Sequence, residues 1–268
     1  MSTQEGPLRL TRIGPIGMLR LARPDKRNAL NAAMLEAWPM LLHAAARDDK
    51  LQVLLVSGGA GLPFSAGADI EEFQRLPGDP AAILGFSERF ATAQEAMAGF
   101  AKPTIAMISG ACVGGGCGLA LGCDLRFADQ TAKFGVTPAK LGLDYSIADT
   151  RRLVDAVGYA PAADLLLSGR LIGAEEALTL GLVTRVFEPA KLEAECRTFA
   201  LAIAANAPST LRSVKAALRA LKSGAKGDDP ASRQAFLDAF NGPDFAEGLA
   251  AFREKRPPQF GRSRDPLP

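Results

Sequence analysis

Two short, continuously apolar runs, each followed at once by a glycine-rich turn, constrain the fold of this chain most. The first is VLLVS at 53–57, which leads into GGAGLPFSAGADI, and the second is TIAMIS at 104–109, which leads into GACVGGGCG. A strand that is apolar at every position is buried on both faces, as in a parallel sheet covered by helices. Helical patterns precede the two runs, at 31–47 and 80–100. The alternation predicts an α/β core.

The remaining segments extend this pattern and then change it. Short strands are predicted at 8–12 and 16–21, as a hairpin-like pair around Gly14-Pro15, and another at 182–187. Helices are predicted at 149–157, 160–167 and 174–180, and from about residue 190 nearly everything is helical. We therefore predict a core over residues 1–200 and a helical C-terminal region over 201–268.

The glycine-rich turns are candidate binding sites for a carbonyl oxygen. A glycine turn at a strand end exposes backbone N–H groups that a ligand can approach without a Cβ atom in the way. Two such turns that face each other would form an oxyanion hole, with two donors for a negatively charged oxygen. A dinucleotide fingerprint is excluded because Leu119 and Leu121 stand where glycines are needed, and neither a P-loop nor a G-x-S-x-G elbow occurs.

The composition excludes several other kinds of catalytic site and partner. The chain has a single histidine, His43, in an alanine- and leucine-rich segment typical of an ordinary helix residue, so no histidine triad or multi-histidine metal site is expected. The four cysteines form no C-x-x-C pair and are predicted to be small buried residues in a reducing compartment. The net charge of +2 gives no reason to expect nucleic acid as a partner.

No signal peptide and no run of about eighteen apolar residues is present, so we expect a cytoplasmic protein without a membrane partner.

Six motifs in order resemble the crotonase superfamily, also called the enoyl-CoA hydratase/isomerase family. They are ARPDKRNALN at 22–31, FSAGADI at 64–70, KPTIAMISGACVGGGCGLALGCDLRFA at 102–128, KFGVTPAKLGL at 133–143, LLLSGRLIGAEEALTLGLVTRVF at 165–187 and DFAEGLAAFREKRPPQF at 244–260. The resemblance implies an α/β fold built as a spiral of ββα units, with a C-terminal helical region for assembly into a homotrimer or hexamer. It implies an acyl-CoA thioester as substrate, with coenzyme A as part of that substrate and no separate cofactor or metal.

The resemblance also assigns candidate residues. The thioester oxygen would be held by the backbone N–H groups of Ala68 and Gly115. The basic side chains of Lys26, Arg27 and Lys255 become candidates for CoA phosphates, although each is equally well explained as a solvated surface charge. The adenine end would lie against the backbone of Ala66, Asp69 and Ile70.

The match breaks at the two glutamates that handle water in hydratases of this family. Gly118 stands at the first position and Pro138 at the second, and neither residue can transfer a proton. Asp144, Tyr145 and Asp149 instead replace positions that are usually nonpolar or glycine. Asp144 and Asp149 are therefore candidate catalytic bases. As an alternative, Asp149 caps a helix or pairs with Arg151 or Arg152.

Three functions follow from these residues. The one favoured is an acyl-CoA enzyme that stabilises a thioester enolate and carries out isomerisation or another reaction that is not hydration. The second is thioester hydrolysis, with Asp144 or Asp149 activating water or acting as nucleophile. The third is a CoA-binding family member without turnover.

Overall fold

The computed structural model describes residues 6–260, and a six-stranded sheet lies at the centre of this part of the chain. Its strands, in spatial order, are β1 (Leu8–Ile13), β2 (Ile16–Leu21), β3 (Val53–Ser57), β4 (Thr104–Ile108), β6 (Leu125–Asp129) and β9 (Arg185–Phe187). The strands β1 and β2 form the predicted antiparallel hairpin, and all other neighbours in this sheet are parallel. A smaller sheet joins β5 (Ala111–Val113), β7 (Lys133–Gly135) and β8 (Ile172–Gly173).

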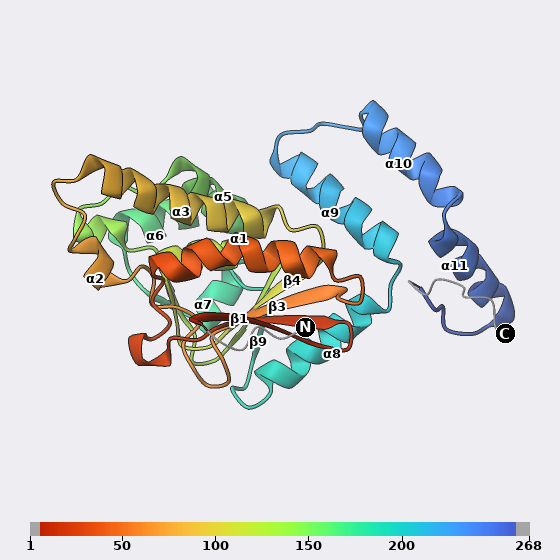
Figure 1. Ribbon diagram of the computed structural model, residues 1–268, viewed down its shortest axis with the longest axis horizontal. Coiled ribbons are helices and arrows are strands. Elements are labelled where there is room, and N and C mark those ends of the chain that lie inside the picture. Colours follow the sequence, from red (N-terminus) through yellow and green to blue (C-terminus); the bar gives the residue numbers. More distant parts are fainter. Residues whose placement is uncertain (1–5, 261–268) are drawn as a thin grey trace.

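Helices cover both faces of the larger sheet, which explains why β3 and β4 are apolar at every position. Leu54 and Val56 face one hydrophobic cluster, under α1 (Ala32–Arg47) and α3 (Pro80–Ala98), which pack against each other (Figure 1). Val53 and Leu55 face a second cluster, which α8 (Leu192–Ala204) closes from the opposite side. The prediction of an α/β core with strands buried on both faces is confirmed.

The helix α1 begins where the sequence predicts it. The side chain of Asn31 accepts a hydrogen bond from the N–H of Met34 at 3.1 Å and thereby caps the helix. His43 lies on the exposed side of this helix, so it is an ordinary surface residue.

Shorter helices and turns connect the strands of the two sheets. The second glycine-rich turn splits into β5 and the buried helix α4 (Gly115–Leu121). The other elements of the core are η1 (Pro24–Lys26), α2 (Ile70–Phe73), η2 (Pro138–Leu141), α5 (Ile147–Val157), α6 (Tyr159–Ser168) and α7 (Ala174–Thr179).

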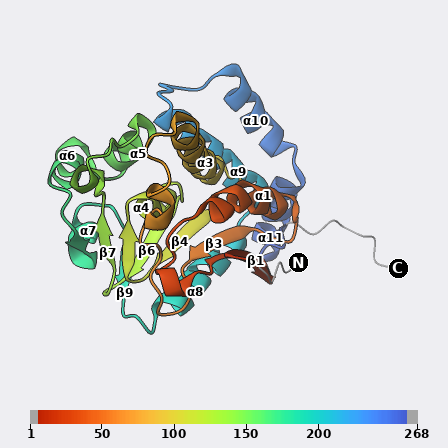
Figure 2. The same ribbon diagram turned by 60° about the vertical axis from the view of Figure 1, so that its left-hand side comes forward.

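Three C-terminal helices, α9 (Pro208–Lys222), α10 (Pro230–Phe240) and α11 (Pro243–Glu254), follow the core (Figures 1 and 2). In Figure 1, α10 and α11 project away from the sheet. The helix α9 is attached by Lys215, which is 5% exposed and pairs with Asp124 at 2.8 Å. The division between residues 200 and 201 stays a prediction, and α8 crosses it while packed on the sheet as far as Ala204.

Within residues 6–260, no helix is long and apolar enough to cross a membrane, and no group of three or more His, Cys, Asp or Glu side chains is placed to hold a metal ion. All four cysteines are buried and unpaired, as predicted. Burial raises the pKa of both Cys123 and Cys196 to about 12, so these thiols are protonated at neutral pH.

Candidate active site

The two glycine-rich turns lie against each other, and Ser65 joins them. The N–H of Ser65 donates to the carbonyl of Ala111 at 2.8 Å, and its carbonyl accepts from the N–H of Val113 at 3.0 Å. Gly67 adopts a φ of 98°, and a Cβ atom there would lie 2.9 Å from the carbonyl oxygen of Val113. Glycine is therefore required at this point both by the backbone conformation and by the close approach of the second turn.

Two backbone donors stand at this junction. Ala68 follows Gly67, and Gly115 is the first residue of α4, where an α-helix leaves N–H groups without an internal partner. Among residues 6–260, neither the N–H of Ala68 nor that of Gly115 donates a hydrogen bond. The structure thus brings two available donors to the meeting point of the turns.

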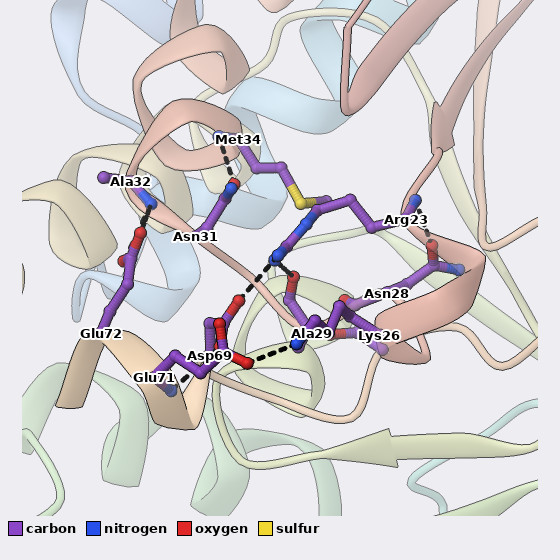
Figure 3. A network of polar contacts seen from close by, with 11 residues as sticks. Arg23, Lys26, Asn28, Ala29, Asn31, Ala32, Met34, Asp69, Glu71 and Glu72 are labelled. Carbon is purple, nitrogen blue, oxygen red and sulfur yellow. Dashed lines mark hydrogen bonds and ion pairs between the residues drawn. The ribbon is translucent and has the colours of Figure 1, made fainter. Parts of the chain in front are cut away.

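The segment 22–31 is hydrogen-bonded to the first glycine-rich turn through backbone groups. The N–H of Leu30 donates to the carbonyl of Gly67 at 2.7 Å, and the N–H of Asp69 donates to the carbonyl of Leu30 at 2.9 Å. The N–H of Ala66 donates to the carbonyl of Arg27 at 3.0 Å. These bonds hold the two segments with the predicted CoA contacts side by side. Figure 3 shows side chains from both segments, among them Arg23 and Asp69, next to each other.

An ion pair between Arg23 and Asp69 lies inside this junction, at 2.8 Å (Figure 3). Burial alone would raise the pKa of Asp69, but the hydrogen bond from Arg23 and the N–H of Glu71 outweigh it, so the pKa lies below its ordinary value of 3.8. The Asp69 side chain is thus already engaged within the protein.

The predicted phosphate contacts differ in availability. Lys26 is paired with Glu71, whose hydrogen bond and charge raise the pKa of the lysine. Arg27 is exposed and its side chain makes no ion pair or hydrogen bond within the described part of the chain. Ile70 is 55% exposed, at the start of α2.

Lys255 is not brought to these residues within one protomer. Lys255 is the C-cap of α11. In Figure 1, α11 lies at the opposite end of the molecule from the start of α1, and the segment 22–31 directly precedes α1.

The two candidate bases lie in different surroundings. Asp144 is exposed in the loop between η2 and α5. Asp149 is 8% exposed, and its carboxylate accepts from the Ser146 hydroxyl at 2.7 Å and from Arg152 at 3.1 Å. The proposed pairing of Asp149 with Arg152 is therefore present, whereas Arg151 pairs with Asp155 instead.

The alternative that Asp149 caps a helix is wrong. The helix α5 begins at Ile147, two residues earlier than predicted, and Ser146 is its N-cap because its hydroxyl accepts from the N–H of Asp149 at 3.0 Å. The same Ser146 hydroxyl donates to the Asp149 carboxylate at 2.7 Å, so the two side chains hold each other in place.

Gly118 lies on α4, one turn beyond Gly115, and faces Asp149. A Cβ atom at Gly118 would overlap the side-chain amide of Gln94 and would lie 3.3 Å from a carboxylate oxygen of Asp149. Pro138 opens η2 and is half-buried. Thus a buried carboxylate from α5 and an amide from α3 occupy the space in front of Gly118.

Sequence reasoning missed Gln94. It is 3% exposed although the helix α3 is mostly solvent-facing. A signal was present, because Phe90, Ala93 and Met97 mark the inward stripe of α3 at helical spacing, and Gln94 falls within that stripe.

A row of aromatic rings leads to the donors. Phe73 and Phe86 lie 4.9 Å apart between ring centroids, as do Phe86 and Phe90. Gly115 packs so closely on the Phe90 ring that a Cβ atom there would overlap it. The N–H of Gly115 is therefore bordered by an apolar surface from α3, suited to an acyl chain.

Comparison with known proteins identifies the class. The family model described as enoyl-CoA hydratase/isomerase matches residues 12–263. The chain belongs to the enoyl-CoA hydratase/isomerase family, the crotonase superfamily, and is an acyl-CoA enzyme of that family.

Individual relatives agree with this assignment. A 2,3-dehydroadipyl-CoA hydratase from Escherichia coli is 37% identical over 91% of this chain and 94% of its own length. A crystal structure from Hyphomonas neptunium, assigned to the enoyl-CoA hydratase/isomerase family, is 41% identical and superposes with a TM-score of 0.92 over 95% of this chain and 97% of that one. An enoyl-CoA hydratase/carnithine racemase from Magnetospirillum magneticum gives a TM-score of 0.91 at 34% identity, over 96% of each chain. The predicted crotonase-like fold is confirmed.

Proposed function

We propose that this protein isomerises the double bond of an enoyl-CoA thioester through an enolate. The N–H groups of Ala68 and Gly115 would hold the thioester oxygen, on which the enolate carries its negative charge. Two observations support this role of the N–H groups: the two turns are in contact, and neither N–H has a partner among the described residues. One preorganised donor of this kind contributes about 3 kcal/mol to a transition state.

Asp149 is the proposed base. The observation that carries this assignment is the position of its buried carboxylate, 3.3 Å from where a Cβ atom of Gly118 would be, one helical turn from the Gly115 donor. Asp144, exposed in its loop, lacks such a position. The carboxylate would take a proton from the second carbon of the acyl chain while the electron pair moves to the thioester oxygen. It would then return the proton to the fourth carbon as the double bond shifts.

A single carboxylate suffices for that proton shift, whereas hydration in this family uses a pair of glutamates. Gly118 and Pro138 stand at the glutamate positions, so the pair is missing. This difference is the reason for proposing isomerisation although several relatives are named hydratases.

The test compares two substrates on purified protein. With 3-hexenoyl-CoA, the absorbance of the conjugated 2-enoyl thioester should rise as the double bond moves. With crotonyl-CoA, that absorbance should stay constant, because hydration would remove it. Hydration of crotonyl-CoA without isomerisation of 3-hexenoyl-CoA would refute the proposal. A thiol reagent in the same assays detects free CoA, and its release would identify a thioester hydrolase instead. Binding of CoA without turnover of either substrate would indicate a non-catalytic member.

For the CoA moiety, Arg27 is the proposed phosphate contact. Its exposed guanidinium has no partner within residues 6–260, whereas Lys26 must first leave Glu71. The backbone of Ala66, Asp69 and Ile70 would border the adenine. Lys255 would reach a CoA phosphate only from a neighbouring subunit.

Assembly into a homotrimer or hexamer is proposed from the C-terminal helices. Large apolar side chains on α9–α11 are exposed in the monomer: Val214, Leu218, Leu221, Phe236, Leu237, Phe240, Phe245, Leu249 and Phe252. Such a concentration of exposed apolar side chains is typical of a protein–protein interface.

A further inference from the structure

The direction of the Ala68 N–H is fixed by a hydrogen bond on the other edge of the same peptide group. A trans peptide is planar, and its C=O and N–H point in opposite directions. The Gly67 carbonyl of this group accepts from the N–H of Leu30 at 2.7 Å, at the short end of the normal range. The Ala68 N–H is therefore directed away from the segment 22–31.

The pairing around Ala68 agrees with this direction. Leu30 and Ala68 form an isolated parallel bridge, and the N–H of Asp69 donates to the Leu30 carbonyl at 2.9 Å. In a parallel pairing of this kind, one residue bonds to the two neighbours of its partner, while the partner's own N–H and C=O face the other way. Leu30 thus holds the peptide groups on both sides of Ala68 and leaves the Ala68 N–H available.

The same bond also makes the Ala68 N–H a better donor. A carbonyl that accepts a hydrogen bond polarises its peptide group, so the N–H of that group donates more strongly. The other proposed donor is built alike, because the Gly114 carbonyl accepts from the N–H of Gly118 at 3.1 Å. For Gly115 the bond comes from its own helix, whereas for Ala68 it comes from a separate segment of the chain.

Asn28 anchors that separate segment. It is fully buried and adopts a φ of 54°, a left-handed conformation that asparagine tolerates better than most residues. Its amide nitrogen donates to the carbonyls of Gly58 at 3.0 Å and Pro63 at 2.7 Å. Its amide oxygen accepts from the N–H of Arg23 at 2.9 Å (Figure 3). Both donors and the acceptor of the side chain are therefore used to tie the segment to the loop after β3.

The main chain of Asn28 continues this attachment towards the glycine-rich turn. Its carbonyl accepts from the Ser65 hydroxyl at 2.8 Å, and the same hydroxyl accepts from the N–H of Gly67 at 3.2 Å. Asn28 and Leu30 together therefore fix both polar groups of Gly67, the residue whose peptide carries the Ala68 N–H.

We infer that Asn28 is a positioning residue for the Ala68 donor and acts through the N–H of Leu30 and the carbonyl of Gly67. This inference rests on the proposed function, in which the Ala68 N–H holds the thioester oxygen, and adds the groups that orient that donor. Asn28 itself does not touch the substrate. Because the donor acts most strongly on the charge that develops on the oxygen, a misdirected N–H lowers the rate more than the affinity.

The most direct test removes the N–H of Leu30 alone. Replacement of Leu30 by its α-hydroxy acid converts the amide into an ester and keeps the side chain. The kcat for 3-hexenoyl-CoA should fall about tenfold to 100-fold, while KM stays within about twofold of the wild-type value. The same replacement at Leu54 is the matched control. That residue is also fully buried, and its N–H donates to the carbonyl of Pro103 at 2.9 Å, so its kcat should remain unchanged.

A second variant tests the Asn28 side chain. Asn28→Gly keeps access to the left-handed conformation and removes the amide, so kcat should again fall with little change in KM. Asn31→Gly, in the same segment, loses only the hydrogen bond from the N–H of Met34 and should keep the wild-type kcat. Circular dichroism verifies that each protein is folded at the assay temperature. If Asn28→Gly does not fold, the Leu30 ester decides the question.

A spectroscopic readout needs no turnover. Butyryl-CoA labelled with carbon-13 at the thioester carbon is bound to each protein, and infrared difference spectra give the stretching frequency of its carbonyl. In the wild type, the two donors should lower this frequency relative to free butyryl-CoA. The lowering should be smaller in the Leu30 ester and in Asn28→Gly, and equal to wild type in the Leu54 and Asn31 controls.

The outcomes separate the inference from the proposed function. A wild-type frequency and kcat in both site variants, or equal losses in the two controls, overturn the inference and leave the proposed function standing. A wild type that lowers the frequency without isomerising 3-hexenoyl-CoA overturns the proposed isomerisation, and the frequencies of the variants then decide the inference. A wild type that does not lower the frequency overturns the proposed role of the Ala68 donor, and the inference with it.

Discussion

The side-chain amide of Gln94 occupies the space that a side chain at Gly118 would need. The two residues come from α3 and α4, which pack against each other in the core. Placing any Cβ atom at residue 118 therefore requires the glutamine to move, and the following predictions begin from this relationship.

The substitution Gly118→Ala should destabilise the protein by about 1–3 kcal/mol, because it overpacks a buried contact. Chemical denaturation of Gly118→Ala, Gln94→Ala and the double variant measures the coupling. The double variant should recover most of the loss. If the two losses simply add, Gln94 is not what excludes a side chain at residue 118.

A glutamate at residue 118, the position that the resemblance assigns to the family's first glutamate, should not create a hydratase. Gly118→Glu places the new carboxylate against Gln94. Pro138, at the second glutamate position, still cannot transfer a proton, so crotonyl-CoA should remain unhydrated. The measurement is the loss of enoyl absorbance in Gly118→Glu and in Gly118→Glu combined with Gln94→Ala. Hydration by either variant would show that one glutamate is enough in this scaffold.

The substitution Asp149→Asn should lower the turnover of 3-hexenoyl-CoA about 100-fold to 10,000-fold, the range typical for loss of a general base. The amide keeps the shape and retains an oxygen that can accept from Ser146, but it loses the charge that pairs with Arg152 at 3.1 Å, so circular dichroism is used to verify that the variant is folded at the assay temperature. Asp144→Asn, at an exposed loop position, is the matched control and should retain wild-type turnover. Equal losses in both variants would argue against Asp149 as the base.

Arg152 should act as a positioning residue for Asp149. Its guanidinium joins Asp149, at 3.1 Å, to Glu95 on α3 and so orients the carboxylate. Arg152→Met should lower kcat about tenfold or more while KM for the thioester stays near the wild-type value, since the arginine is not proposed to touch substrate. A change confined to KM would place Arg152 in substrate binding instead.

The ion pair between Arg23 and Asp69 predicts a pH dependence of stability. The folded-state pKa of Asp69 lies below the ordinary value of 3.8, so its contribution is fully present above that pH and is lost as the pH falls through the folded-state value. Asp69→Asn should therefore cost about 1–3 kcal/mol at pH 7, from a charged hydrogen bond lost in a buried setting.

Urea unfolding of wild type and Asp69→Asn at pH 7, 5 and 3 checks this sign. The difference between the two proteins should be equal at pH 7 and 5 and smaller at pH 3. A difference that grows on acidification would contradict the assignment.

The exposed apolar face of α10 should hold the subunits together. Phe236 and Phe240 are 66% and 54% exposed, and their rings meet edge to face with 5.2 Å between centroids. Phe236→Ser combined with Phe240→Ser should reduce the mass measured by light scattering from a trimer or hexamer towards the monomer. Arg233→Ser, on the same helix, is a control for changes in surface charge. A wild-type protein that is monomeric at micromolar concentration would refute the proposed assembly.

The strands and the glycine-rich turns were predictable because their signals are local. Val53 to Val56 is apolar throughout, and a run this short that ends in a glycine-rich turn is typical of a strand covered on both faces. Ala68 and Gly115 were assigned through the resemblance to the crotonase superfamily, and their role as donors to the thioester oxygen stays a prediction. The start of α5 was predicted two residues late, because Ser146 was not identified as a cap of the helix that contains Asp149.

The remaining features depend on contacts between elements far apart in the sequence. That Gln94 opposes Gly118 follows from how α3 packs on α4, and the sequence contains only the helical stripe that hints at it. The choice between Asp144 and Asp149 likewise needed their burial, since the two residues lie five positions apart in similar sequence surroundings.

The role of Ser65 has a consequence for how such a scaffold diversifies. Its backbone bonds to Ala111 and Val113, and its hydroxyl donates to the carbonyl of Asn28 at 2.8 Å, so the turns that carry the proposed donors are held largely by main-chain groups that substitutions elsewhere leave in place. The proposed base, Asp149, and the residue in front of Gly118, Gln94, are by contrast side chains, on α5 and α3 respectively. A library that keeps Asp149 and is randomised at residue 94 alone should therefore retain the capacity to form thioester enolates while changing which acyl chains fit in front of Gly118.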